Sequence, residues 1–300
     1  MNDDSLVELL HYLRHHGYRF ATVTPATHSI VVARPLARKP DLRDIFGWNR
    51  SFSEDDLEPA VCVLLERAGA IETGQTGELR SLVRVASLGE DLIAHSAFPT
   101  DQPDSVFFGP DTYRFVRFVQ RHTTSLEAVG ALVDMGAGSG AGGIATVRGL
   151  RTSELTLVDV NPKANRYARI NAAAAGLRVE TVQSDRVPEF DLLIGNAPYL
   201  MDTSERVYRH GGDLFGGAVS LDWVRQGLER LRQGRKILLY TAAAYVDGQS
   251  PLLTEIEEEC RAARAALCIE EIDADVFGNE LTEPGYEKVE RIAAVGIRIG

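Results

Sequence analysis

The chain is poor in cysteine: its 300 residues include only Cys62, Cys260 and Cys268. Their wide spacing excludes a close-paired redox motif or zinc site, and we interpret them as small apolar core residues. The seven histidines also lack the spacing of a catalytic zinc site. We therefore expect no metal site and no disulfide framework, since a chain of this length can bury the cores of two domains without them.

Long apolar runs and an excess of positive charge are also missing. No apolar run approaches the roughly 20 residues that span a membrane, and residues 1–10 are acidic where a signal peptide would be basic. We expect a soluble, cytoplasmic protein without membrane contact. The 43 acidic residues outnumber the 32 basic ones, for a net charge of −11, which disfavours broad binding to phosphate backbones. One cluster could still form a phosphate-contacting face: Arg34, Arg38, Lys39 and Arg43.

The first third of the chain has the pattern of a small α+β domain. Leucines at helical spacing predict a helix over residues 5–16, and a second helix is predicted to follow Ser53 and end at Gly69. Two strand-like runs joined at a Gly-Gln-Thr-Gly turn come next. We predict a winged-helix-like domain over residues 1–104. Because the stretch is acidic and lacks a basic recognition helix, both nucleic-acid binding and a docking or lid role stay open.

A linker rich in Pro, Asp and Ser at residues 96–105 precedes a region of alternating strands and helices. For residues 105–300 this alternation predicts a doubly wound, mostly parallel, seven-stranded Rossmann-like sheet. The predicted helices cover residues 113–120 and 164–175. The predicted strands cover residues 131–135, 155–160, 179–183, 190–194, 236–240 and 292–299.

The stretch "DMGAGSGAGG", residues 134–143, follows the first of these strands. In an open α/β sheet this turn contacts the ligand, and Gly136, Gly138 and Gly140 permit positive φ and close approach to the backbone. Gly138, Gly140 and Gly143 also fit the dinucleotide pattern G-x-G-x-x-G, with Asp159 at a suitable distance for ribose hydroxyls. The glycines alone therefore leave a nicotinamide-dependent oxidoreductase open as an alternative.

Acidic residues around the glycines help to distinguish between the two classes of cofactor. Asp134 precedes them, Asp159 is followed by Val-Asn-Pro, and Asp185 closes a Gln-Ser-Asp triplet. With these residues, the region from about 105 to 300 resembles the class I S-adenosylmethionine (SAM) methyltransferases, whose first motif is D-x-G-x-G-x-G. The resemblance implies SAM as cofactor, with Asp159 at its ribose hydroxyls and Asp185 at its adenine amine. It implies four residues at the methionine end: Asp134, Gly136, Gly138 and Gly140.

The tetrapeptide "NAPY", residues 196–199, resembles the N-P-P-Y motif of amino-group methyltransferases, among them the HemK/PrmC glutamine methyltransferases and several nucleobase methyltransferases. Asn196 and the carbonyl of Ala197 would accept the two N–H groups of a planar amide or amine, so that the nitrogen lone pair faces the methyl group. Tyr199 would stack on the planar group, and Pro198 completes the motif. Ala197 replaces the usual proline, which preserves the carbonyl but leaves a less rigid backbone.

A second match is "GPDTYRFV", residues 109–116, which resembles the R-P-D-T-E-x-L-V segment of glutamine methyltransferases, although Asp111 or Thr112 could equally cap a helix. Together these motifs favour a SAM-dependent N-methyltransferase of a macromolecular substrate. We expect a protein glutamine side chain. The alternatives are an adenine or guanine amine of RNA or DNA, a smaller metabolite, and a non-catalytic SAM-binding scaffold.

Overall fold

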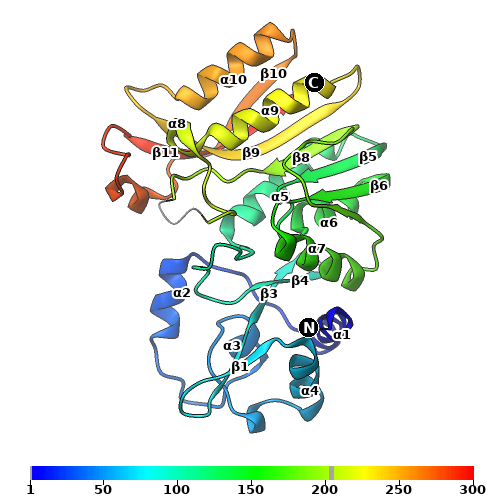
Figure 1. Cartoon of the computed structure of the whole chain (residues 1–300), viewed down its shortest axis with the longest axis vertical. Coiled ribbons are helices and arrows are strands. Elements are labelled where there is room, and N and C mark those ends of the chain that lie inside the picture. Colours follow the sequence, from blue (N-terminus) through cyan, green and yellow to red (C-terminus); the bar gives the residue numbers. More distant parts are fainter. Residues whose placement is uncertain (1, 203–205) are drawn as a thin grey trace.

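A seven-stranded sheet in the order β10-β11-β9-β8-β5-β6-β7 forms the centre of the larger part of the chain, in a computed structural model that describes residues 2–202 and 206–300 (Figure 1). Neighbours from β9 to β7 pair in parallel, and β11 runs antiparallel to both β9 and β10. The strands are β5 Ala128–Met135, β6 Arg151–Val158, β7 Glu180–Val182, β8 Leu192–Asn196, β9 Lys236–Tyr245, β10 Leu267–Asp273 and β11 Arg291–Ile299.

This sheet confirms the predicted fold class, including its number of strands. The sequence patterns did not predict strand β10. Among the described residues that strand pairs only with β11. It contains Glu270, Glu271 and Asp273, and its burial does not alternate as in a half-buried strand. An edge strand therefore lacked the periodicity that identified the others.

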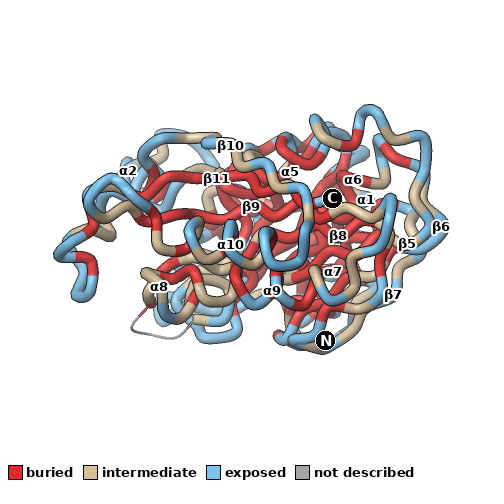
Figure 2. The backbone as a smooth tube through the Cα atoms, turned by 90° about the horizontal axis from the view of Figure 1, so that it is seen from above, coloured by how far each residue is buried: buried red, intermediate tan, exposed pale blue. Residues whose placement is uncertain are grey.

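Helices cover both faces of the sheet, and the strands between them form the buried interior (Figure 2). Successive residues such as Leu192 and Leu193 belong to different apolar cores, because side chains alternate across a strand. The helices on one face are α5 Pro110–Thr123, α6 Ala141–Val147 and α7 Pro162–Ala174. Those on the other are α9 Ala218–Arg230 and α10 Pro251–Ala262, and two short helices in connections are α8 Asp213–Gly216 and η2 Gly278–Thr282.

The N-terminal part contains short helices and two hairpins. Its elements are α1 Asp3–His15, α2 Pro25–Val32, α3 Leu42–Phe46, η1 Glu54–Asp56, α4 Pro59–Ala68, β1 Ile71–Thr73, β2 Leu79–Ser81, β3 Val83–Leu88 and β4 Asp91–Ser96. The first predicted helix and the β1–β2 hairpin are confirmed. The helix predicted directly after Ser53 begins only at Pro59, because Asp56 accepts hydrogen bonds from Ser53 within a 3₁₀ turn. The winged-helix assignment stays a prediction.

Helix α7 lies between the sheet and the N-terminal part. Ala168 and Ala172 pack in the core of the sheet, whereas Tyr167 and Ile170 pack with the leucines of α1. The side-chain nitrogen of buried Asn171 donates to the carbonyls of Ala94 in β4 and Ser139 in the glycine loop, both at 2.9 Å. Apolar packing thus continues across the predicted boundary at residues 104/105, and the division into two domains stays a prediction.

None of the described helices has the length and apolar character required to cross a membrane.

Candidate functional site

A cavity of about 600 Å³ lies at the carboxyl ends of β5, β6 and β8. The chain continues from β5 to β6 on one side, and β8 pairs with the other side of β5, so the cavity lies at the topological switch point where α/β sheets bind ligands. Most of the predicted site residues meet here. Those that line the cavity are Asp134, Gly136, Gly138, Asp159, Asp185, Asn196 and Pro198.

The glycine loop adopts the left-handed backbone expected from its sequence, with φ of 66° at Gly136, 55° at Gly138 and 78° at Gly140. A Cβ on Gly136 would lie 2.4 Å from the Trp223 ring, whereas one on Gly138 would meet only a backbone oxygen 4.0 Å away. Gly140 is the N-cap of α6 and lies outside the described lining of the cavity. Gly136 therefore allows close packing against Trp223, Gly138 leaves space for a ligand, and Gly140 caps the start of α6.

The next two glycines allow α6 to approach the sheet. A Cβ on Gly142 would lie 2.5 Å from the Phe115 ring, and one on Gly143 would lie 2.7 Å from the Leu157 side chain. The third glycine of the G-x-G-x-x-G pattern, Gly143, thus serves helix–sheet packing.

Asp134 lies at the end of β5 with only 1% of its surface exposed. One carboxylate oxygen accepts a hydrogen bond from the Gly143 N–H at 2.7 Å. Burial raises the pKa of Asp134 to about 7, while the Gly143 hydrogen bond opposes that rise and the nearby Asp159 carboxylate adds to it. The carboxyl group therefore fastens the first turn of α6 to the strand that precedes the loop.

Asp159 follows β6 and reaches the same loop. One carboxylate oxygen accepts from the Gly138 N–H and the other from the Asn161 N–H, each at 2.8 Å. Burial raises the pKa of Asp159, and these two hydrogen bonds oppose the rise. Each carboxylate oxygen keeps a free lone pair, so the group can also accept from ligand hydroxyls.

Asp185 lies at the cavity rim, where its exposed carboxylate pairs with exposed Arg186 at 3.7 Å. Sequence reasoning did not assign the apolar lining residues of this cavity to the site, and Val160 and Trp223 are two examples. Val160 is 44% exposed although apolar, and its position next to Asp159 was a usable local signal. Trp223 comes from α9, so only the folded chain brings it to the glycine loop.

The tetrapeptide begins at the last residue of β8. The side-chain oxygen of Asn196 is buried, has no hydrogen-bond partner among the described residues, and belongs to a residue that lines the cavity. Ala197 is buried, and its N–H donates to the Tyr240 carbonyl of β9 at 3.3 Å. A proline at position 197 would lack this donor, so the departure from N-P-P-Y coincides with a strand-to-strand hydrogen bond.

Tyr199 lines a second cavity, of about 620 Å³, and not the one lined by Asn196 and Pro198. Its ring centroid lies 5.5 Å from that of Phe277. Burial and the adjacent Asp111 carboxylate raise the pKa of Tyr199 well above its usual value. The structure thus separates Tyr199 from the other predicted catalytic residues, and its stacking on the acceptor stays a prediction.

The segment 109–116 contributes to this second cavity. Pro110 begins α5, and the Thr112 hydroxyl oxygen accepts from the Gly109 N–H at 3.3 Å, so Thr112 caps the helix. Asp111 is buried, accepts from the Tyr240 hydroxyl at 2.9 Å and pairs with Arg114 at 3.2 Å. Capping therefore explains Thr112, whereas Asp111 connects α5 to β9.

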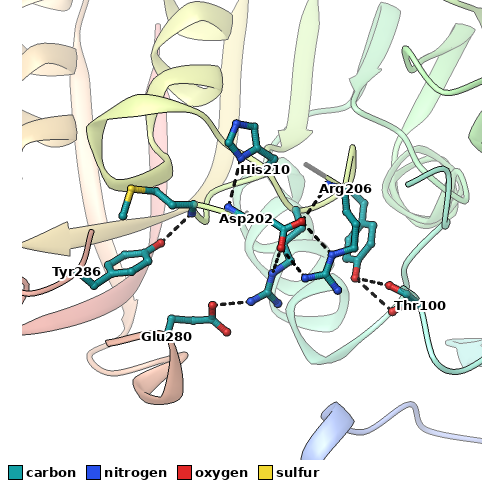
Figure 3. Close-up of polar contacts among 9 residues, drawn as sticks. Thr100, Asp202, Arg206, His210, Glu280 and Tyr286 are labelled. Atoms are coloured by element: carbon teal, nitrogen blue, oxygen red, sulfur yellow. Dashed lines mark hydrogen bonds and ion pairs between the residues drawn. The ribbon is translucent and has the colours of Figure 1, made fainter. Parts of the chain in front are cut away.

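Polar contacts hold the chain that follows the tetrapeptide (Figure 3). The Met201 N–H donates to the Tyr286 hydroxyl at 2.9 Å, and Arg206 binds both carboxylate oxygens of Asp202. The Asp202 N–H donates to the His210 Nδ1 at 3.3 Å, and His210 also lines the first cavity. None of these contacts has a signal in the sequence. Among the described residues, no group of three or more metal-ligating side chains comes together.

Comparison with known proteins adds family information to this geometry. Residues 117–220 match the family described as methyltransferase small domain. A release factor glutamine methyltransferase of Deinococcus radiodurans is 31% identical over 130 residues, which cover 41% of this chain and 44% of that protein. The chain thus matches less than half the length of this curated relative.

Two solved structures align with about three quarters or more of this chain. Trm5b from Pyrococcus abyssi is 15% identical, with a TM-score of 0.52 over 76% of this chain and 62% of that one. The M. jannaschii tRNA m1G37 methyltransferase is 14% identical, with a TM-score of 0.48 over 82% and 67% of the two chains. The similarity to Trm5b supports the Rossmann-like fold.

The family match covers the glycine loop, Asp159, Asp185 and the tetrapeptide. Residues 117–220 therefore form a methyltransferase domain of the SAM-dependent class, with S-adenosylmethionine as its cofactor. This finding decides against the nicotinamide alternative that the glycines had left open.

Proposed function

We propose that the protein is an N-methyltransferase of the N-P-P-Y type that transfers the methyl group of SAM to a planar amide nitrogen, that of a protein glutamine side chain. The observation that carries the proposal is the unpartnered side-chain oxygen of Asn196, buried at the carboxyl end of β8. A buried acceptor without a donor costs about 1–3 kcal/mol. An N–H group of the acceptor substrate would satisfy it.

The residues of the first cavity fit SAM. Asp159 keeps free lone pairs for the ribose hydroxyls, and Gly138 leaves open space beside its backbone. In this proposal Gly136, Gly138 and Asp134 lie at the methionine end, Gly140 shapes the loop, and Asp185 meets the adenine amine. When bound, SAM would supply the methyl group from its sulfonium centre. The carbon–sulfur bond would break, and both of its electrons would stay on the sulfur.

The chain's own contribution to the reaction is orientation. An amide nitrogen is a weak nucleophile because its lone pair is delocalised into the adjoining π system. Asn196 accepts one N–H and the Ala197 carbonyl accepts the second, so the lone pair is held toward the cofactor cavity. A proton leaves for water once the nitrogen has become cationic. No strong base is required, and the Asp134 and Asp159 carboxylates are already engaged by backbone N–H groups.

Charge favours a protein acceptor over a nucleic acid. The chain carries a net charge of −11. In the basic cluster of the N-terminal part, Arg38 pairs with Asp41 at 3.2 Å and Asp44 at 2.7 Å, and Lys39 pairs with Asp56 at 3.9 Å. This face thus carries less free positive charge for phosphates than the sequence suggests. The relative named as a release factor glutamine methyltransferase also supports a glutamine acceptor.

In this proposal residues 105–300 catalyse the reaction, residues 1–104 dock the substrate, and the reaction takes place in the cytoplasm. The test incubates the full chain with methyl-labelled SAM and a cell extract, and divides the product between protease and nuclease. We expect protease, and not nuclease, to release the label. Release by nuclease would identify a nucleobase acceptor, and label confined to small molecules would identify a metabolite. SAM binding without transfer in every extract would support a scaffold instead.

A further inference from the structure

We propose that the second cavity binds the body of the acceptor substrate and is closed to anions, so that it admits an uncharged segment and rejects a phosphate-bearing one. The inference rests on the proposed function, because it concerns the acceptor whose nitrogen reaches Asn196. It adds a selection by charge that the tetrapeptide does not provide.

The position of the second cavity suits this role. Phe107 and Tyr208 line both cavities, and their rings stack with centroids 5.2 Å apart and planes 10° apart. The tetrapeptide passes between the cavities as well, since Pro198 lines the first and Tyr199 the second. A group that fills the second cavity can thus contact Tyr199 while the nitrogen attached to it reaches the first.

The walls come from parts of the chain that are distant in sequence. Residues 24–26 at the start of α2 and residues 98–101 of the linker both line the cavity. The Tyr208 hydroxyl donates to the Thr100 carbonyl at 2.9 Å, so the linker is attached to the segment after the tetrapeptide (Figure 3). Aromatic side chains give the cavity flat apolar surfaces that suit an uncharged group. They are Phe98, Phe107, Tyr199, Tyr208 and Phe277.

In the described lining there are three guanidinium groups, and carboxylates of the chain already pair with each of them. Arg206 binds both oxygens of Asp202, at 2.9 and 2.5 Å (Figure 3). Arg209 bonds to Glu280 and lies 3.5 Å from the same Asp202 carboxylate. The side-chain hydrogen bond from Arg206 is the main reason that the pKa of Asp202 falls to about 2, so this carboxylate stays charged at neutral pH.

The third guanidinium, Arg114, lies between Asp111 at 3.2 Å and Asp273 at 3.0 Å. Among the described lining residues, the carboxylates outnumber the cations. They are Asp101, Asp111, Asp275 and Glu280. A phosphate entering the cavity would have to displace an existing partner or lie beside these carboxylates, where repulsion between like charges at close range weakens binding. An uncharged amide avoids this repulsion.

The test compares two probes of similar size, N-acetylglutamine-N′-methylamide and N-acetylphosphoserine-N′-methylamide. Binding is measured by ligand-observed NMR on the full chain in the presence of saturating S-adenosylhomocysteine, so that the probes cannot bind at the cofactor position of the first cavity. We expect the glutamine probe to bind at least tenfold more tightly than the phosphoserine probe. Equal or tighter binding of the phosphoserine probe, or no binding of the glutamine probe, would overturn the proposal.

Two matched pairs of variants locate the binding. Ala26→Trp places a ring in the cavity wall from an exposed position of α2, whereas Ile30→Trp changes a residue of the same helix that is 60% exposed and outside the described lining. Only Ala26→Trp should weaken binding of the glutamine probe, by about tenfold or more. Both variants should keep wild-type affinity for S-adenosylhomocysteine. Similar glutamine-probe affinities in the two variants would place the binding elsewhere.

The second pair tests charge. Asn279 is exposed in the cavity lining, so Asn279→Lys adds a cation there and Asn279→Gln does not. Only the lysine variant should gain affinity for the phosphoserine probe, and equal affinities in the pair would contradict selection by charge. Probe binding is measured without methyl transfer, so failed transfer to protein in the extract experiment contradicts the proposed function, whereas a failed probe experiment contradicts the anion-closed cavity alone.

Discussion

A carboxylate oxygen of Asp159 accepts a hydrogen bond from the Gly138 N–H at 2.8 Å, which fastens the end of β6 to the glycine loop that follows β5. The residue expected to hold the ribose of SAM thus also shapes the loop expected to hold its methionine end. Substitutions at Asp159 should therefore affect both the contact with the cofactor and the geometry of the loop.

Asp159→Ala should weaken SAM binding by tenfold or more, because it removes the ribose acceptor and the Gly138 contact together. Asp185→Ala should weaken SAM binding only a few-fold, since this carboxylate is largely exposed at the rim of the cavity and is screened by water. Calorimetric titration with SAM measures both dissociation constants. Equal losses in the two variants would contradict the role assigned to Asp159.

Asn196→Ala should lower kcat by about 100-fold while SAM affinity stays nearly unchanged, because the side-chain oxygen acts mainly on the acceptor in the transition state. Asn196→Asp keeps an acceptor oxygen at the same position and should retain more activity than the alanine variant. Steady-state kinetics with the labelled acceptor and calorimetry with SAM check the two parts. An alanine variant as active as wild type would exclude Asn196 from the reaction.

Gly136 and Gly138 allow a matched comparison within one loop. Both have positive φ, but only a Cβ on Gly136 would collide with Trp223. Gly138→Ala should cost about 1–2 kcal/mol of backbone strain, and Gly136→Ala should cost clearly more because Trp223 must also move. Urea unfolding of both variants measures the difference. A Gly136 variant as stable as the Gly138 variant would show that Trp223 moves freely.

Buried His28 should make stability depend on pH. Burial, followed by the nearby Arg84, lowers its pKa from 6.5 to about 4, so the folded chain binds fewer protons than the unfolded chain between these values. The contribution is complete above pH 6.5 and is lost as the pH falls toward 4, by up to about 3 kcal/mol. In urea unfolding at several pH values, His28→Phe should lose less stability than wild type over this range. Parallel pH profiles would contradict the prediction.

Local sequence patterns predicted most of the sheet and several of the residues that meet in the first cavity. Gly136 and Gly138 lie in a turn after a buried strand, and Asp134 and Asp159 lie at strand ends, so residues near in sequence determine their backbone positions. Parallel strands place such ends along one edge of the sheet. Edge strand β10 was missed because it pairs with one neighbour among the described strands and is partly exposed to solvent, so its burial does not alternate along the sequence.

The sequence by itself determined the fold class, the glycine loop and the position of Asn196 at a strand end, because these follow from periodicity and from residues that adjoin one another. Only the tertiary structure placed Trp223 against Gly136, and only it paired Arg114 with Asp273 and Arg209 with Glu280. It also placed Pro198 and Tyr199, neighbours in the tetrapeptide, in the linings of different cavities. These contacts join residues up to 159 positions apart, and their geometry depends on how helices, linker and sheet pack together.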